Sequence, residues 1–255
     1  MMSCQTAIRQ WYESVAGQNA ATAVQSAVAE MSNDIFGYYA VQVGELAGEY
    51  TLLHDSRIRS CFSIALDEQA GVDASVDLVA NPAALPLVFD NLDLVVVSHV
   101  LDCAASPHDV LREIDRVLVP EGHCILIAFN AFSLRGLSLA LKNLVRRDES
   151  HSLYTAFRVQ DWFEVLGFEV LEVRTVGHRY NIDRWSVFNR LGWLKWLADK
   201  YSQSFGHVRL IHVRKKVVKM TPWKPKLRTS PLLKPGMAVN TNGAGQAANN
   251  SKEHE

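Results

Sequence analysis

Long hydrophobic runs, closely spaced cysteines and an excess of positive charge in the body of the chain are all missing from this sequence. The longest apolar runs, such as the six residues 124–129, are far shorter than the ~20 residues that span a bilayer. The first residues also lack the apolar stretch of a secretory signal. These absences predict a cytoplasmic protein without a transmembrane segment.

The four cysteines are Cys4, Cys61, Cys103 and Cys124, and none of them forms a CxxC pair. This spacing argues against a zinc site. Cys61 and Cys124 fall inside apolar runs, where a thiol behaves as a small hydrophobic group. We therefore expect reduced cysteines, a reducing compartment and no bound metal.

Charge is distributed unevenly along the chain. Residues 1–208 hold 16 Lys and Arg against 25 acids, whereas residues 209–255 hold 10 against 2. Any contact with a polyanion is therefore expected of the basic tail, and no DNA binding is expected. From about Lys215 the composition shifts to Pro and Lys, and later to Asn, Gly and Ala. This composition cannot bury enough apolar surface to offset ordering, so we predict that residues 221–255 are disordered.

What the sequence does contain is an alternation of short apolar strands with amphipathic helices. Residues 5–31 have apolar side chains at helical spacing, which predicts one or two helices ahead of the sheet. The strand 92–98 is apolar on both faces, as in a central parallel strand. The alternation predicts an α/β fold, a doubly wound and mostly parallel sheet with helices on both faces. Strands are expected at 39–43, 61–66, 76–79, 92–98, 124–129, 168–176 and 208–213, and later helices at about 107–118, 159–166 and 183–200.

The stretch 81–130 carries several motifs at fixed spacing. Asn81 ends the expected third strand, and Leu85-Pro86-Leu87 forms the turn after it. The next strand begins D-x-V at Asp93, and L-R-E-x-x-R-V-L-x-P-x-G follows over residues 111–122. In these positions the chain resembles the type 11 branch of the class I methyltransferases. Beyond them, from about residue 9 to 222, it is similar to a bacterial group of methyltransferases of unknown substrate. The resemblance implies a Rossmann-like fold and S-adenosylmethionine as methyl donor.

The donor loop departs from the family pattern. In the family, the first strand ends in an acid for the amino group of the methionine part and runs into G-x-G-x-G. Gly44 and Gly48 match the outer glycines, Gln42 replaces the acid, and Leu46 replaces the middle glycine. The resemblance makes Gln42, Gly44 and Gly48 cofactor-binding candidates, with the Gln42 amide oxygen as an acceptor for the ammonium group. The alternative is that Gly44 and Gly48 only form a tight strand-to-helix turn.

Further donor-site candidates follow the next three expected strands. Asp67 is the candidate for the ribose hydroxyls, and the alternative is a solvated loop acid. Asn81 and Pro82 match the position that meets the adenine amino group in the family, although an Asn before Pro also forms turns. Ser98 ends the fourth strand, at the carboxyl edge where open parallel sheets bind ligands.

Two candidates for catalysis lie at the same edge. His99 follows Ser98 and is suited to contact the donor or to act as a general base near neutral pH. Its alternative is a packed or capping histidine. Asn130 ends the fifth strand and is expected to touch the acceptor. Methyl transfer depends largely on alignment of the nucleophile with the sulfonium, so an obvious base is not required.

The sequence thus predicts a cytoplasmic S-adenosylmethionine-dependent methyltransferase with N-terminal helices at 1–36, the methyltransferase domain at 37–220 and a tail at 221–255. A small-molecule acceptor is favoured, and its identity is not encoded in any motif. The alternative, suggested by Gln42 and Leu46, is a non-catalytic methyltransferase-like binding or interaction protein.

Overall fold

The computed structural model describes residues 4–44, 46, 52–66, 76–130, 154–177 and 206–217. The chain divides into two units, Met1–Val217 and Val218–Glu255, and every described residue lies in the first. The predicted helix 183–200 and the predicted disordered tail fall outside the described residues. In the described part of the chain, no helix is long and apolar enough to cross a membrane.

Two helices precede the sheet, as the spacing over residues 5–31 predicts. They are α1 (Cys4–Glu13) and α2 (Val15–Ser32). Ser14 separates them, and its hydroxyl accepts a hydrogen bond from the Gly17 N–H at 3.1 Å. This is an N-cap, which satisfies one of the donors left open at the start of α2.

A seven-stranded sheet is formed within the described residues, in the order β3-β2-β1-β4-β5-β7-β6. Strands β1 to β5 pair in parallel, whereas β7 runs antiparallel between β5 and β6. The predicted α/β fold with a mostly parallel sheet is confirmed. The strands are β1 (Tyr39–Val43), β2 (Ser60–Ala65), β3 (Leu78–Val79), β4 (Leu92–Ser98), β5 (Leu118–Phe129), β6 (Phe168–Val176) and β7 (Val208–Lys215).

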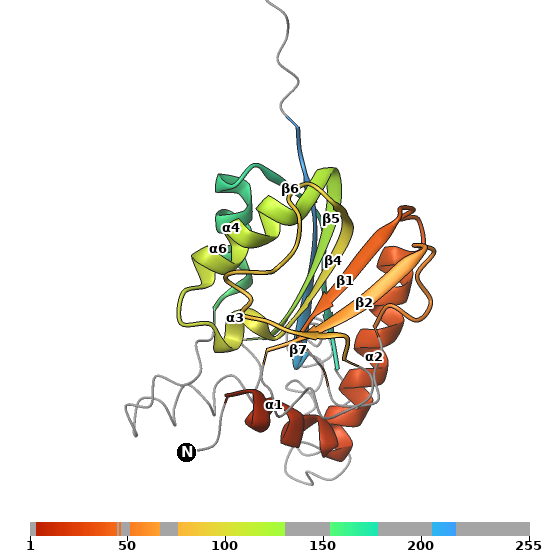
Figure 1. The fold of residues 1–255 in the computed structure, drawn as a ribbon. Coiled ribbons are helices and arrows are strands. Elements are labelled where there is room, and N and C mark those ends of the chain that lie inside the picture. Colours follow the sequence, from red (N-terminus) through yellow and green to blue (C-terminus); the bar gives the residue numbers. More distant parts are fainter. Residues whose placement is uncertain are drawn as a thin grey trace, which may run out of the picture. The chain divides into compact units, whose positions relative to one another are not determined.

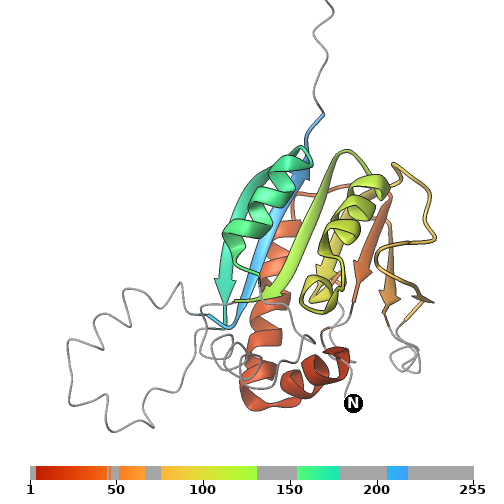
Figure 2. The same cartoon turned by 90° about the vertical axis from the view of Figure 1, so that its left-hand side faces the viewer.

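Helices cover both faces of this sheet (Figures 1 and 2). On one face, α2 packs over inward side chains such as Leu94 and Ile125. On the other face, α4 (Pro107–Val117) and α6 (Ala156–Val165) pack over residues such as Val95 and Leu126. Because side chains of β4 and of the second half of β5 point alternately into two apolar layers, these stretches are buried on both sides.

Apart from shifts of a few residues at the ends of other elements, two features differ from the sequence prediction. Strand β5 begins at Leu118, because Leu118 pairs with Leu92 before the register shifts and pairing resumes at His123. Pro120-Glu121-Gly122, predicted to separate helix from strand, therefore lies within β5. Cys4 and Cys103 form a disulfide between α1 and α3 (Val100–Cys103), which corrects the expectation of reduced cysteines. Among the described residues no cluster of His, Cys, Asp and Glu could hold a metal.

Candidate functional site

The sheet changes direction of winding between β1 and β4, and Gly44 lies directly after β1 at this point. Open α/β sheets bind ligands beyond the carboxyl ends of their strands at such a switch point. Gly44 has a φ of 82°, and its N–H donates to the Ile64 carbonyl of β2 at 2.8 Å. A Cβ added here would lie 2.4 Å from the Ser98 carbonyl oxygen. Glycine is therefore required both by the backbone conformation and by the close approach of β4.

Ser98, the last residue of β4, has an unusual side chain. It is fully buried, and within the described part of the structure its hydroxyl has no hydrogen-bond partner. A buried hydroxyl without a partner costs free energy that an alanine would not. The end of β4 thus combines a close approach of the Gly44 backbone with a buried hydroxyl that lacks a polar partner among the described residues.

The Gln42 carboxamide is used within the chain. Its Nε2 donates to the Gly44 carbonyl at 3.1 Å, and its Oε1 accepts from the Leu52 N–H at 3.1 Å. Leu46, at the position of the family's middle glycine, is fully buried in the layer under α2. Gln42 therefore connects the end of β1 to the backbone at Leu52. Leu46 is held by apolar packing in the layer under α2.

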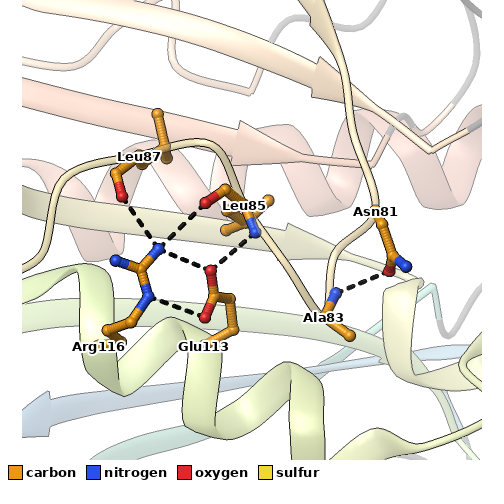
Figure 3. A network of polar contacts seen from close by, with 6 residues as sticks. All are labelled: Asn81, Ala83, Leu85, Leu87, Glu113 and Arg116. Carbon is orange, nitrogen blue, oxygen red and sulfur yellow. Dashed lines mark hydrogen bonds and ion pairs between the residues drawn. The ribbon is translucent and has the colours of Figure 1, made fainter.

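Asn81 follows β3 in an exposed turn. Its Oδ1 accepts from the Ala83 N–H at 3.0 Å, so the turn-forming geometry that Asn favours before Pro82 is present. The chain beyond this turn is fastened to α4 by two charged side chains, Glu113 and Arg116 (Figure 3).

Glu113 and Arg116 form a clamp on the Leu85-Pro86-Leu87 turn. Glu113 accepts from the Leu85 N–H at 2.7 Å, and Arg116 Nη2 donates to the Leu85 and Leu87 carbonyls, each at 3.0 Å. Arg116 also donates through Nε and Nη2 to Glu113. The hydrogen bond from Arg116, followed by that from Leu85, holds the pKa of Glu113 below its ordinary value. The L-R-E-x-x-R motif thus fixes the loop that leads away from Asn81.

His99 is fully buried and belongs to a hydrogen-bonded chain. Its Nε2 lies 2.6 Å from the Tyr12 hydroxyl of α1, and its Nδ1 lies 2.8 Å from Asp102 Oδ2. Asp102 also accepts from the Phe129 N–H at 3.0 Å. Hydroxyl, imidazole and carboxylate are thus aligned beside the end of β4, an arrangement that can move a proton between its members.

Asn130 holds the end of β5 to the start of β7. Its side-chain Nδ2 donates to the Gly206 carbonyl at 2.9 Å, and its backbone N–H donates to the His207 carbonyl at 3.0 Å. The side chain is 1% exposed. Its position at the carboxyl edge is as expected, and its contacts are those of a residue that shapes the edge.

The structure brings Gly44 and Ser98 together, and it places His99 directly beyond them. Gly48 and Asp67 lie outside the described residues. Tyr12 and the clamp of Glu113 and Arg116 were not predicted as site residues. The family motif pointed to Glu113 and Arg116 by position, whereas Tyr12 had no signal beyond its place in an amphipathic helix.

Known proteins share both the sequence pattern and the fold. Residues 44–126 match the methyltransferase domain family. The uncharacterized protein YafS of Escherichia coli (strain K12) is 28% identical over 194 residues, which are 73% of this chain and 72% of that protein.

Solved structures show the same fold at low sequence identity. A methyltransferase in complex with the Trm112 methyltransferase activator of Haloferax volcanii has a TM-score of 0.59 and 19% identity, covering 78% of this chain and 91% of that one. A SAM-dependent methyltransferase of Thermotoga maritima has a TM-score of 0.57 and 15% identity, covering 81% and 93%. None of these similarities favours the non-catalytic alternative.

Proposed function

We propose that this chain, whose residues 44–126 match the methyltransferase domain family, is a class I methyltransferase that binds S-adenosylmethionine at the carboxyl edge of β1 and β4 and methylates a small-molecule acceptor. The observation that carries the proposal is the close approach of Gly44 to Ser98. Gly44 leaves no room for a side chain against β4, and the Ser98 hydroxyl is buried without a partner among the described residues. A polar ligand at the switch point would satisfy that hydroxyl.

The donor-binding residues in this proposal are distributed over the loops that follow β1 to β4. The donor supplies a methyl group on a positively charged sulfur. Ser98 offers a hydroxyl, and Gln42 keeps the Gly44 backbone in place through its amide. Asn81 and Pro82 stand at the adenine position that the family resemblance assigns to them. Gly48 and Asp67 complete the proposed set, for the donor loop and the ribose hydroxyls respectively.

On the acceptor side, we assign His99 and Asn130. In the proposed arrangement His99 accepts a proton from the Tyr12 hydroxyl while Asp102 stabilises the imidazolium, so Tyr12 can in turn take a proton from an acceptor. Asn130 sets the position of the β5 end against β7. Because alignment supplies much of the rate of a methyl transfer, these residues act mainly by orienting groups.

Calorimetric titration with S-adenosylhomocysteine tests donor binding. We expect Kd on the order of 1–100 μM, about −8 to −5.5 kcal/mol. Saturating ligand should also raise the melting temperature, because a ligand that binds only the folded state stabilises it. The proposal is wrong if millimolar ligand produces neither heat nor a melting shift.

Ser98→Ala makes this test specific to the site. Removing one hydrogen bond should weaken S-adenosylhomocysteine binding about 3- to 10-fold, or roughly 0.7–1.4 kcal/mol. The melting temperature of the free protein should stay the same or rise, because the variant removes a buried hydroxyl without a partner. Ser32→Ala is the control, since Ser32 is equally buried but donates to Ala29 within α2. It should leave the affinity unchanged.

A further inference from the structure

The disulfide between Cys4 and Cys103 connects helix α1 to the segment that follows the carboxyl end of β4. Cys4 lies in the first turn of α1, and Cys103 ends the short helix α3, which starts one residue after His99. Their Cα atoms are 5.7 Å apart, and the residues are 99 positions apart in sequence. The bond therefore joins two segments that only the fold brings together.

Helix α1 lies across the carboxyl ends of the parallel strands, as both ribbon views show (Figures 1 and 2). From Ile8 onward, the helix is fixed by non-covalent contacts. The Tyr12 hydroxyl meets His99, and the Trp11 ring packs edge-on against Phe129 at the end of β5, with ring centroids 5.0 Å apart. Ile8 is 1% exposed in the layer under α2. The disulfide adds a covalent link at the first turn of the same helix.

We propose that Cys4 and Cys103 form a reversible thiol–disulfide latch, which fixes α1 over the carboxyl edge when oxidised and lets its first turn open when reduced. The effect on ligand exchange rests on the proposed donor site, whereas the effect on α1 does not. A low-molecular-mass disulfide of the glutathione type is the oxidant.

The chemistry is a two-step exchange. One cysteine thiolate attacks a sulfur of the small disulfide and forms a mixed disulfide, releasing one small thiolate. The other cysteine thiolate then attacks the protein sulfur of that mixed disulfide and releases the second. Two electrons pass from the cysteine pair to the small disulfide, and the two cysteine protons end on the two small thiols. Reduction by the same thiols in excess reverses both steps.

Proximity to a second cysteine, together with partial exposure, distinguishes this pair from the other cysteines. Cys4 and Cys103 are both half-buried, so a small thiol can approach them. Cys124 is fully buried in β5, and burial strongly raises the pKa of its thiol, so it has little thiolate to react. Cys61 is a free and exposed cysteine on β2, which makes it a matched control.

The first experiment measures whether the bond forms. The full-length protein is incubated with mixtures of reduced and oxidised glutathione, denatured and alkylated, and the blocked cysteines are identified by mass spectrometry. We expect a peptide linked through Cys4 and Cys103 to accumulate as the oxidised fraction rises, while Cys124 stays alkylated and Cys61, which has no neighbouring cysteine, carries either the alkyl group or one glutathione. Alkylation of Cys4 and Cys103 at every ratio would overturn the proposal.

The second experiment measures the consequence for α1. Hydrogen exchange of residues 4–9 should be at least about tenfold faster in the reduced protein, because an element end without its covalent link opens locally. Cys4→Ser and Cys103→Ser should behave like the reduced protein, and Cys61→Ser like the parent. Equal exchange in the oxidised and reduced forms would show that the bond is not a latch.

The third measurement follows S-adenosylhomocysteine by stopped flow. Association and dissociation should both be at least about fivefold slower in the oxidised protein, because α1 must move for the ligand to pass. Equal rates with unequal α1 exchange would reject control of the site. If no binding occurs in either form, the proposed donor function fails, while the alkylation and exchange results still decide whether α1 is latched.

Discussion

At the end of β4, two adjacent polar residues are both buried but differ in their hydrogen bonding. His99 has both ring nitrogens bonded, to Tyr12 and Asp102, whereas the Ser98 hydroxyl has no partner among the described residues. Burying a hydroxyl without a hydrogen bond costs about 1–3 kcal/mol. A serine at such a position does not help the stability of the fold, which agrees with the ligand contact proposed above, whereas the His99 contacts attach α1.

Gly44→Ala should affect the proposed donor site far more than a comparable change elsewhere. The new Cβ would lie 2.4 Å from the Ser98 carbonyl, and the φ of 82° is unfavourable for alanine. We expect the affinity for S-adenosylhomocysteine to fall at least tenfold, about 1.4 kcal/mol. Calorimetry and a melting curve should be recorded on the same sample.

Gly167→Ala is the matched control for this variant. Gly167 also has a positive φ, 88°, but a Cβ added there would meet no atom within 4 Å, and the residue lies between the end of α6 and the start of β6. It should lower the melting temperature by backbone strain and leave donor affinity unchanged. An unchanged affinity in folded Gly44→Ala would place the donor away from this loop.

The positions of candidate site residues with a local signature were predictable from the sequence, and contacts between residues far apart in sequence were not. Gly44 follows a short apolar strand, and Ser98 ends a longer one, so both could be placed at the carboxyl edge. Tyr12 meets His99 across 87 positions of sequence. Nothing near Tyr12 distinguishes it from other core residues of an amphipathic helix, so its contact with the site could not be inferred.

At the scale of elements, helix α4 supports the site without forming part of it. Its apolar face packs on β4 and β5, while Glu113 and Arg116 hold the loop between Asn81 and the start of β4. The family motif around these residues is therefore explained by loop positioning. The motif was recognised from the sequence, but its role in holding the loop is seen only in the hydrogen bonds of Glu113 and Arg116.

Arg116→Lys should loosen this clamp. Lysine cannot reproduce the parallel donors of the guanidinium, so the bonds to Leu85, Leu87 and Glu113 cannot all be kept. We expect donor affinity to fall about 3- to 10-fold, or roughly 0.7–1.4 kcal/mol, because Asn81 is less well positioned. Calorimetric titration with S-adenosylhomocysteine measures this affinity. Arg112→Lys is the control on the same helix, since the Arg112 side chain is 70% exposed and pairs only with Asp109 among the described ion pairs. Equal affinities in the two variants would argue against a positioning role.

The start of β5 shows where prediction of an element fails. Pro120 and Gly122 are typical turn residues, and the helix does end nearby, at Val117. Leu118 nevertheless pairs with Leu92, and Glu121 takes a φ of 65° inside the irregular stretch. A bulge lets a strand carry such residues, and its presence depends on the neighbouring strand rather than on local preference.

For the whole molecule, the parallel core was predictable because its strands carry a strong apolar signal. Strand β4 was predicted with its observed bounds. The position of β7 between β5 and β6, and the bond from Cys4 to Cys103, depend on chain segments that meet only in the folded state. Cysteine spacing therefore suggested free thiols where the structure has a disulfide.

The stability of the whole molecule should depend on pH through a histidine pair on β5 and β7. His123 Nδ1 lies 2.9 Å from His212 Nε2. Burial, and then the neighbouring His123, lower the pKa of His212 from 6.5 to about 4. The unfolded chain therefore binds this proton more readily than the folded protein. The stabilisation is complete above about pH 6.5 and is lost as the pH falls toward 4.

Urea unfolding of the parent at pH 7.0, 6.0 and 5.5 should show this loss. Well below the unfolded pKa, one such proton changes the free energy of unfolding by up to about 1.4 kcal/mol per pH unit. His212→Gln keeps a neutral hydrogen-bonding side chain beside His123 but cannot take up the proton, so its stability should decline less steeply. His54→Gln is the control, because the His54 side chain is 78% exposed. Its decline should match that of the parent. If all three proteins lose stability in parallel, other groups govern the acid sensitivity of the fold.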